Sequence, residues 1–268
     1  MNNSRIAFIG AGNMAGSLIR GLVAKGVTGQ QIAACDLDAA KLTQLQQECG
    51  IRTGSMADVA STADVVVLAV KPQGMAEVCA TLRPALQPGA LIISIAAGIP
   101  LRSLEAWLGS ERAIVRCMPN TPALVLEGAT GLYANANTSA TQAALAEAIL
   151  AAVGISAWLA SEEDINAVTA LSGSGPAYFF LLMEAMEQAG VRMGLAPELA
   201  RQLTLQTALG AARLASGSDV APNELRRRVT SPGGTTEAAI RSFESADFRA
   251  VVEQALLAAQ KRSVALAG

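Results

Sequence analysis

The glycine-rich segment at residues 10–16 constrains the fold of this chain more than any other feature. It reads Gly-Ala-Gly-Asn-Met-Ala-Gly, which matches the pattern G-x-G-x-x-G/A with Ala15 in the third place. A short apolar run at 5–10 leads into it, and a helical pattern follows over residues 13–25. The first glycine permits a tight turn, the second lets backbone approach a pyrophosphate, and the small third residue lets helix and strand pack closely. This strand–turn–helix context favours a dinucleotide-binding site over a mere tight turn.

An acidic residue follows the second apolar run. Asp36 comes directly after residues 32–35, about twenty residues beyond the glycines, where a carboxylate can accept hydrogen bonds from the adenosine ribose hydroxyls. A carboxylate there repels a 2′-phosphate, and no arginine follows closely, although Lys41 lies on the next helix. The sequence therefore favours NADH with some tolerance of NADPH. Asp36 could instead cap the helix that begins at Asp38, and both roles can coexist.

The rest of the chain changes its pattern near residue 160. Apolar runs at 64–70, 91–95 and 113–117, each after a helical interval, are typical of strands buried on both faces. Such alternation predicts an α/β fold, a Rossmann-type doubly wound parallel sheet, over a dinucleotide-binding domain at 1–160. No convincing strand follows, so 161–268 is predicted to be an all-helical domain. Its helices are expected near 161–171, 176–192, 197–216, 222–229, 235–243 and 246–266.

Three further strand ends are expected at the same crevice, because ligands in open α/β sheets bind outside the carboxyl ends of the strands. The candidate cofactor-binding residues are Gly10, Gly12, Asn13, Met14, Asp36, Ala69, Val70, Lys71, Pro72, Ala96, Ala97, Gly98 and Asn120. Lys71 could also be a surface lysine before a turn proline. Asn120 could merely hold the turn between two prolines.

A second glycine-rich loop lies far from the first. Residues 231–236 read Ser-Pro-Gly-Gly-Thr-Thr and join a basic helical run to an apolar-periodic helix. A loop of this kind presents unpaired backbone N–H groups and hydroxyls at a helix N-terminus, which suits a carboxylate. Together with the glycine-rich start of the chain, it indicates a reductase that acts on a small carboxylated substrate.

Composition excludes several other classes of protein. The chain contains no histidine, which removes imidazole metal ligands and histidine-dependent nucleophilic or dehydrogenase mechanisms. The net charge of −2 provides no field for nucleic acid or an anionic membrane. The one dense basic cluster, 226–228, is typical of a solvated face or of intersubunit ion pairs.

The cysteines and the lengths of the apolar runs indicate in which cellular compartment the protein is expected. The four cysteines, Cys35, Cys49, Cys79 and Cys117, lack C-x-x-C spacing, so they are expected to be small apolar residues rather than disulfides or metal ligands. No metal is expected. The chain enters a strand by about residue 5, which leaves no room for a signal peptide, and no apolar run reaches membrane-spanning length. A cytoplasmic protein without a membrane partner is the expectation.

Five motifs taken in order resemble the pyrroline-5-carboxylate reductase family over essentially the whole chain. They are the segments 10–14, 69–72, 116–122 (Arg-Cys-Met-Pro-Asn-Thr-Pro), 171–178 (Leu-Ser-Gly-Ser-Gly-Pro-Ala-Tyr) and 231–236. The resemblance implies reduction of 1-pyrroline-5-carboxylate to L-proline with NAD(P)H, the last step of proline biosynthesis. It also implies a C-terminal helical domain that interlocks with that of a second subunit in a homodimer, commonly assembled further into a decamer of five dimers. A monomeric helical bundle that buries most of its own apolar surface is the alternative.

The resemblance also implies that the second loop, 231–236, binds the substrate. The substrate carboxylate would be held by Ser231 and by backbone N–H groups of Gly233, Gly234 and Thr235. Thr236 is the candidate catalytic residue, with its hydroxyl near the ring nitrogen, although it could instead cap its helix.

Three further positions either have a role that the resemblance implies or differ from what the family usually has there. Asp219 would lie near the substrate, at a position where the family often has glutamate. At Met56 relatives can carry an asparagine that contacts the cofactor, and Ser55 could substitute for it. Ser174 is a modest pocket candidate, in a segment that primarily breaks one helix and starts the next.

Two other functions fit the same two-domain plan. One is a related imine or β-hydroxyacid reductase, but the β-hydroxyacid enzymes use a lysine on the long interdomain helix, and residues 161–192 contain none. The other is a non-catalytic dinucleotide-sensing protein, which would have no reason to keep the hydroxyl-rich loop. A purely oligomeric scaffold is disfavoured by the intact glycine motif.

Overall fold

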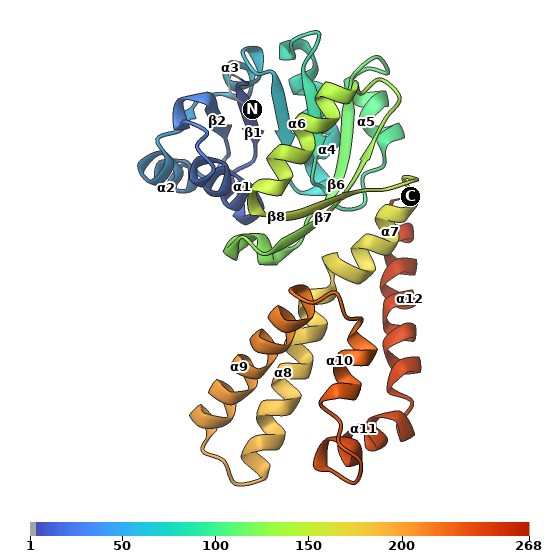
Figure 1. Cartoon of the computed structure of the whole chain (residues 1–268). Helices are drawn as coiled ribbons and strands as arrows, with labels where there is room; N and C mark the ends of the chain where they lie inside the picture. The colour runs from blue at the N-terminus through green and yellow to red at the C-terminus, as the bar shows by residue number, and fades with distance from the viewer. Residues whose placement is uncertain (1–3, 268) are drawn as a thin grey trace. The chain divides into compact units, whose positions relative to one another are not determined.

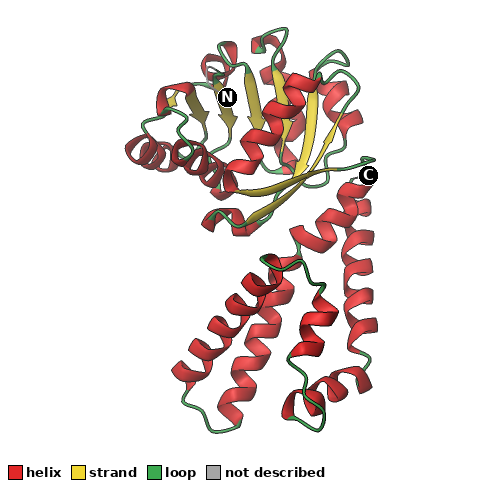
Figure 2. Ribbon diagram, in the orientation of Figure 1, coloured by secondary structure: helices red, strands yellow, loops and turns green. Residues whose placement is uncertain are grey.

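An eight-stranded sheet with helices on both faces forms the first of two units into which the contacts divide the chain (Figures 1 and 2). The computed structural model describes residues 4–267. The first unit extends to Ser174 and takes in the chain again from Ala259, and the second comprises Gly175–Ala258. The predicted domain boundary at 160 therefore falls inside the first unit, which also holds the last helical turns of the chain.

The helices and strands follow the predicted alternation closely. In the first unit they are β1 (Ile6–Ile9), α1 (Asn13–Ala24), β2 (Ile32–Cys35), α2 (Ala39–Cys49), β3 (Arg52–Thr53), α3 (Met56–Ser61), β4 (Val65–Leu68), α4 (Met75–Leu82), β5 (Leu91–Ser94), α5 (Leu101–Leu108), β6 (Ile114–Met118), β7 (Gly128–Ala134), α6 (Ala140–Leu150), β8 (Gly154–Trp158) and α7 (Asp164–Val168). A π-helical turn, Thr169–Gly173, links α7 to α8 (Gly175–Arg192), which is followed by α9 (Pro197–Ser216), α10 (Pro222–Arg228), α11 (Thr235–Ser245) and α12 (Phe248–Leu266).

The strand order is β3-β2-β1-β4-β5-β6-β7-β8, and neighbours from β3 through β6 are parallel. This is the doubly wound order in which the chain reverses direction across the sheet between β1 and β4. The predicted fold class is confirmed. Three strands were not predicted: the two-residue β3, β7, which runs antiparallel to β6, and β8, which runs parallel to β7. β3 is short and polar, and β7 and β8 are rich in small residues, so none of the three has the apolar run that identified the others.

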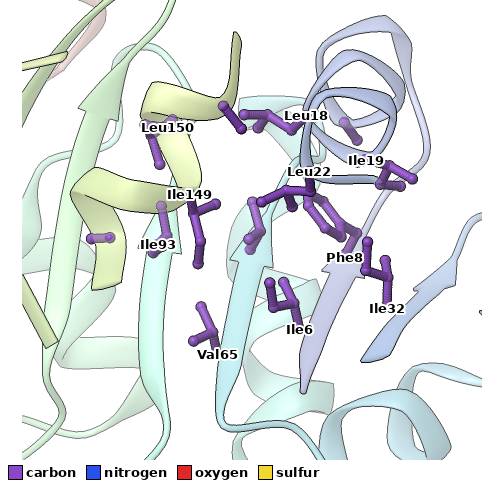
Figure 3. Packing of buried hydrophobic residues seen from close by; sticks show 14 of the residues in the cluster. Ile6, Phe8, Leu18, Ile19, Leu22, Ile32, Val65, Ile93, Ile149 and Leu150 are labelled. Atoms are coloured by element: carbon purple, nitrogen blue, oxygen red, sulfur yellow. The ribbon is translucent and has the colours of Figure 1, made fainter. Parts of the chain in front are cut away.

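The core forms because each central strand is apolar on both faces. On β1, Ile6 and Phe8 pack with α1, α2 and α6, whereas Ala7 and Ile9 pack with α3, α4 and α5. Successive side chains of a strand point to opposite faces, so one short apolar strand supplies both layers. Figure 3 shows Phe8 beneath Leu22, which belongs to α1. The sheet is thereby fixed between two helical layers, with its carboxyl edge free to carry a site.

Two helices of the second unit start at a proline. Pro197 and Pro222 are the first residues of α9 and α10, where a missing N–H costs nothing. Many of their apolar side chains face solvent: on α8 the exposed fractions of Phe179, Phe180 and Leu181 are 64%, 63% and 67%. Exposed apolar surface on this scale is typical of a protein–protein contact.

The expectation that no segment reaches membrane-spanning length was wrong. Within residues 4–267, one continuous helical stretch at 164–192 is long and apolar enough to cross a membrane by length and composition alone, with a mean hydropathy of 1.2. No uninterrupted apolar run in this part of the sequence is that long, but α7, the π-turn and α8 form one continuous helix. Length and composition do not separate a spanning helix from one that packs against protein.

Candidate active site

The first glycine turn is built at the junction of three strands. Gly10 follows β1, donates its N–H to the carbonyl of Cys35 at 2.8 Å, and has a φ of +101°. A Cβ on Gly10 would lie 2.6 Å from the carbonyl oxygen of Ala69, at the end of β4. Because both the backbone angle and the space exclude a side chain, only glycine fits this position.

The N-terminus of α1 is open at the next glycine. Gly12 is the N-cap, supplies no side-chain cap, and has no other atom within 4 Å of where its Cβ would be. The first turn of α1 contains no acidic residue. Its N–H groups, which have no partner within the helix, therefore face a space that suits an anion such as a pyrophosphate. Asn13 is exposed and Met14 is partly buried against the core, so both border this space.

Asp36 joins the glycine turn to the second strand. Its Oδ2 accepts the N–H of Ala11 at 2.6 Å, and its Oδ1 accepts the N–H of Asp38 at 2.9 Å. The alternative that Asp36 caps the next helix is wrong, because Asp38 is the N-cap of α2 and accepts from Ala40 and Lys41. Asp36 instead holds the turn, and its carboxylate lies beside the open helix end.

The nearby lysine has a partner of its own. The ammonium of Lys41 lies 3.2 Å from the carboxylate of Asp38, and this hydrogen bond is the main cause that lowers the pKa of Asp38. Both groups are well exposed, so Lys41 can readily leave Asp38 and pair with another anion.

The ends of β4 and β5 lie beside the glycine turn on the same edge of the sheet. Ala69 donates its N–H to the carbonyl of Ile9, which ties the segment 69–72 to β1. Lys71 is exposed before the short helix Pro72–Gly74. After β5, Ala96 is buried and Gly98 has a φ of +75°. Since β1, β4 and β5 are parallel, the predicted candidates of all three strand ends share one edge.

Asn120 holds the turn after β6, which was the structural alternative to a contact with the cofactor. Its side-chain oxygen accepts the N–H of Ala129 at 2.8 Å, and its side-chain nitrogen donates to the carbonyl of Ser172 at 3.0 Å. The side chain is nearly buried, so it links the turn after β6 to the start of β7 and to the π-turn. Ser55 is similarly occupied, because its hydroxyl caps α3 in a capping box with Asp58.

Sequence reasoning missed one buried ion pair in this unit. Arg116 on β6 is 3% exposed, and its guanidinium lies 2.7 Å from the carboxylate of Glu162. The same carboxylate oxygen accepts the N–H of Leu101 at 2.7 Å. The signal was available: a charged residue inside an otherwise apolar strand requires a charged partner, because an unpaired buried charge is costly.

The second loop, 231–236, lies between α10 and α11 in the helical unit. Here the expectation of unpaired glycine N–H groups was wrong. Gly233 donates its N–H to Oε2 of Glu237 at 2.8 Å, and Gly234 donates its N–H to the carbonyl of Ser231 at 3.0 Å. Glu237 sits three residues into α11, from where a carboxylate can reach back over the first helical turn. The carboxylate of Glu237 therefore already accepts a hydrogen bond from Gly233, one of the predicted donors to the substrate.

The loop keeps other groups that suit an anion. Gly234 is the N-cap of α11 and gives no side-chain cap, so the first-turn N–H groups from Thr235 and Thr236 lie at an uncapped helix end. Ser231 is exposed, and Thr236 is half-buried. Asp219 is exposed in the loop before α10. The loop thus presents hydroxyls and two backbone donors: the N–H of Thr235, which was predicted, and the N–H of Thr236, which takes the place of the two glycines.

The arginine cluster is paired within the chain. Arg227 and Arg228 both bond Glu224, and this bonding lowers the pKa of Glu224 to about 2. Arg226 pairs with Glu244 on α11, so two adjacent helices are joined by an ion pair. The groups are exposed, which makes each pair a weak contribution to stability.

The four cysteines are free thiols, and burial raises their pKa values, to about 11 for Cys79. Over residues 4–267, no group of three or more histidine, cysteine, aspartate or glutamate side chains is placed to hold a metal ion.

Two family models match different parts of the chain, and full-length relatives belong to one family. The profile of the family "Pyrroline-5-carboxylate reductase dimerisation" matches residues 162–266, and that of "NADP oxidoreductase coenzyme F420-dependent" matches residues 5–98. A pyrroline-5-carboxylate reductase of Pseudomonas aeruginosa is 61% identical to the chain over all of its residues and 98% of the relative.

Solved structures agree over the full length. A pyrroline-5-carboxylate reductase from Coxiella burnetii superimposes with a TM-score of 0.96 and 46% identity, covering all of both chains. A pyrroline carboxylate reductase from Plasmodium falciparum, solved with NADP bound, gives a TM-score of 0.88 and 32% identity over all of both chains. The similarity therefore extends through the glycine turn and the 231–236 loop alike.

Proposed function

The chain belongs to the pyrroline-5-carboxylate reductase family, and we propose that it reduces 1-pyrroline-5-carboxylate to L-proline with a nicotinamide dinucleotide. The observation that carries this proposal is that one chain combines an open helix N-terminus behind a glycine turn with an uncapped, hydroxyl-rich helix N-terminus at 231–236. The first suits a pyrophosphate and the second a carboxylate. A hydride donor and a small carboxylated acceptor are the two reactants that the reaction needs.

The residues around the glycine turn fit the cofactor. Gly10 lets the chain turn tightly, and Gly12 leaves open space in front of the first turn of α1. We assign the pyrophosphate to this helix end and the adenosine ribose to Asp36. Beside them, the segments 69–72 and 96–98 would line the remainder of the site. When bound, the dinucleotide supplies the hydride that the imine carbon accepts.

The chain's own residues bind and orient the substrate. We assign its carboxylate to the N–H groups of Thr235 and Thr236 and to the hydroxyl of Ser231, at the positive end of α11. The hydroxyl of Thr236 would donate to, or hold a proton at, the ring nitrogen. A protonated imine is already strongly electrophilic, so positioning and the exclusion of water are the main tasks left to the protein. This explains how a reductase can work without histidine.

The coenzyme preference rests on Asp36 and Lys41. A carboxylate beside the ribose favours NADH, because it repels a 2′-phosphate. Lys41 could offset that repulsion only by leaving Asp38. We therefore propose NADH as the better reductant, with NADPH also accepted.

We further propose a homodimer formed through the helical unit, assembled into a decamer of five dimers in the cytoplasm. The exposed apolar side chains of α8, such as Phe179 and Phe180, support a large protein contact. Light scattering of the purified protein would give its mass directly. A monomer at micromolar concentration would overturn this assembly.

The direct test is a spectrophotometric assay of the purified protein with pyrroline-5-carboxylate and either NADH or NADPH. Substrate-dependent oxidation of one or both cofactors is the expected result. Cofactor binding without turnover would favour a dinucleotide-sensing protein instead, and turnover of β-hydroxyacids alone would favour the related reductases.

A further inference from the structure

Arg116 is a buried cation with one ionic partner. On either side of it along β6, Val115 and Cys117 belong to the apolar core, and the side chain of Arg116 itself is 4% exposed. Its Nη1 lies 2.7 Å from Oε1 of Glu162. Removing the charge of Glu162 would leave the buried guanidinium without an ionic partner, which is far costlier than the loss of an exposed ion pair. The carboxylate of Glu162 is therefore held at one place beside the sheet.

That carboxylate has a second function. The same Oε1 accepts the N–H of Leu101 at 2.7 Å, and Leu101 is the first residue of α5. The N-cap of α5 is Pro100, which provides no side-chain cap. Glu162 thus supplies both the missing hydrogen-bond acceptor and a negative charge at the positive end of the helix. A residue sixty-one positions along the chain replaces the usual local cap.

The segment held in this way is the loop between β5 and α5. Inside it, the N–H of Ala96 reaches the hydroxyl of Ser94 at a distance of 3.5 Å, which is a weak bond. Gly98 lies against the end of α12, where an added Cβ would be 3.3 Å from the Cβ of Leu266. The loop is therefore also held from outside, by the end of α12 on one side and by the start of α5 on the other.

The same loop follows β5, the neighbour of β4, on the carboxyl edge that carries the glycine turn. We propose that Arg116 and Glu162 are positioning residues, which hold the backbone of 96–98 where a bound pyridine dinucleotide contacts it. The proposal rests on the proposed function only for the identity of the cofactor. Arg116 fixes Glu162, Glu162 fixes the start of α5, and the start of α5 fixes the loop.

The competing interpretation is that the ion pair stabilises the first unit and nothing more. In that case its loss lowers the melting temperature, while the folded protein binds the cofactor unchanged. The positioning role makes a different prediction, because the effect falls on cofactor affinity and leaves the KM for the imine substrate unaltered.

Two conservative substitutions separate charge from reach. Glu162→Asp keeps the charge but shortens the side chain, and Glu162→Gln keeps the reach and an acceptor oxygen but removes the charge. Glu163, the exposed next residue, provides matched controls as Glu163→Asp and Glu163→Gln. For each variant, the Kd of NADH and NADPH is measured by fluorescence titration, together with kcat and both KM values.

We expect Glu162→Asp to raise the Kd of the cofactor about tenfold, the change that follows from losing one hydrogen bond to a charged group. Glu162→Gln should have a smaller effect in the same direction, and both controls should stay within about twofold of the parent protein. A folded Glu162→Asp variant that binds the cofactor as well as Glu163→Asp does would overturn the proposal.

Hydrogen exchange of the parent protein gives a readout that needs no variant. Bound cofactor should slow exchange of the backbone N–H groups at 96–98, and Leu101 should already be protected without it. Fast exchange at Leu101, or no change at 96–98, would also overturn the proposal. If the parent protein binds the dinucleotide with these changes but does not reduce the imine, the proposed function fails and the positioning role stands.

Discussion

The carboxylate of Asp36 accepts the N–H of Ala11 at 2.6 Å, across the gap between the end of β2 and the first glycine turn. Its other oxygen accepts the N–H of Asp38. Asp36, which we assign to the ribose, therefore also stabilises the glycine turn that we assign to the pyrophosphate. Its replacement should affect both binding and the order of the turn.

Asp36→Ser is expected to weaken NADH binding at least tenfold, because hydrogen bonds to a charged group contribute about 1.5–3 kcal/mol. NADPH should lose less, since repulsion of the 2′-phosphate disappears with the carboxylate. The ratio of the two Kd values, measured by fluorescence titration, checks this. Asp64→Ser, at the amino end of β4, is the control and should leave the ratio unchanged. An unchanged ratio in Asp36→Ser would remove Asp36 from the site.

Gly10→Ala should destabilise the first unit and abolish dinucleotide binding. The backbone φ of +101° costs about 1–2 kcal/mol for an L-residue, and the clash with the carbonyl of Ala69 adds to it. Gly26→Ala is the matched control, because Gly26 has a φ of +91° but open space around its Cβ position. The melting temperatures of the two variants distinguish the backbone strain, which both share, from the steric clash with Ala69, which only Gly10→Ala has. Equal melting temperatures would mean that the close approach to Ala69 is unimportant.

Thr236→Val is expected to lower kcat about ten- to a hundredfold, because one hydrogen bond to the charged ring nitrogen is lost while the side-chain shape is kept. Thr236→Ser should restore most of the activity. Thr230→Val serves as the control, since the hydroxyl of Thr230 is already bonded to the carbonyl of Arg226. Steady-state kinetics at saturating cofactor measure the effect. If Thr236→Val keeps the parent kcat, the assignment of Thr236 as the catalytic residue is wrong.

Glu237→Gln should lower the KM for the imine carboxylate about two- to fivefold, because a fixed negative charge next to the anion site disappears. Glutamine keeps the reach and can still accept the N–H of Gly233, so the melting temperature should change little. The kcat should be unchanged. Glu198→Gln, in the first turn of α9, is the control for loss of one surface charge. A raised KM would show that Glu237 orders the loop for the substrate rather than competing with it.

The thiols should be nearly inert at neutral pH. Burial raises the pKa of Cys79 to about 11 and also raises that of Cys117, and the thiolate is the reactive form. Cys49, which is half-buried, should therefore react first with an aromatic disulfide reagent at pH 8. The labelling rate of Cys79 should rise only as the pH approaches about 11. Labelling counted by mass spectrometry, native and in denaturant, tests the order.

Much of the fold followed from local sequence signals. The run 64–70 predicted a strand because it is apolar on both faces, and Pro197 indicated the start of a helix because proline is tolerated in the first turn. The segment 128–134 escaped prediction because its glycines carry no such pattern. It is a strand because β6 and β8 pair with it.

The sequence by itself determined the turn at Gly10, the parallel sheet and the hydroxyl-rich loop, since each depends on backbone angles or on side-chain periodicity within a short window. The tertiary structure alone decided which polar groups meet. Glu162 accepts from both Arg116 and Leu101, and Asp36 accepts from Ala11. Glu237 takes a donor that the loop was expected to keep free. Most of these partners lie far apart along the chain, so their pairing depends on how helices and strands pack, which no local pattern encodes.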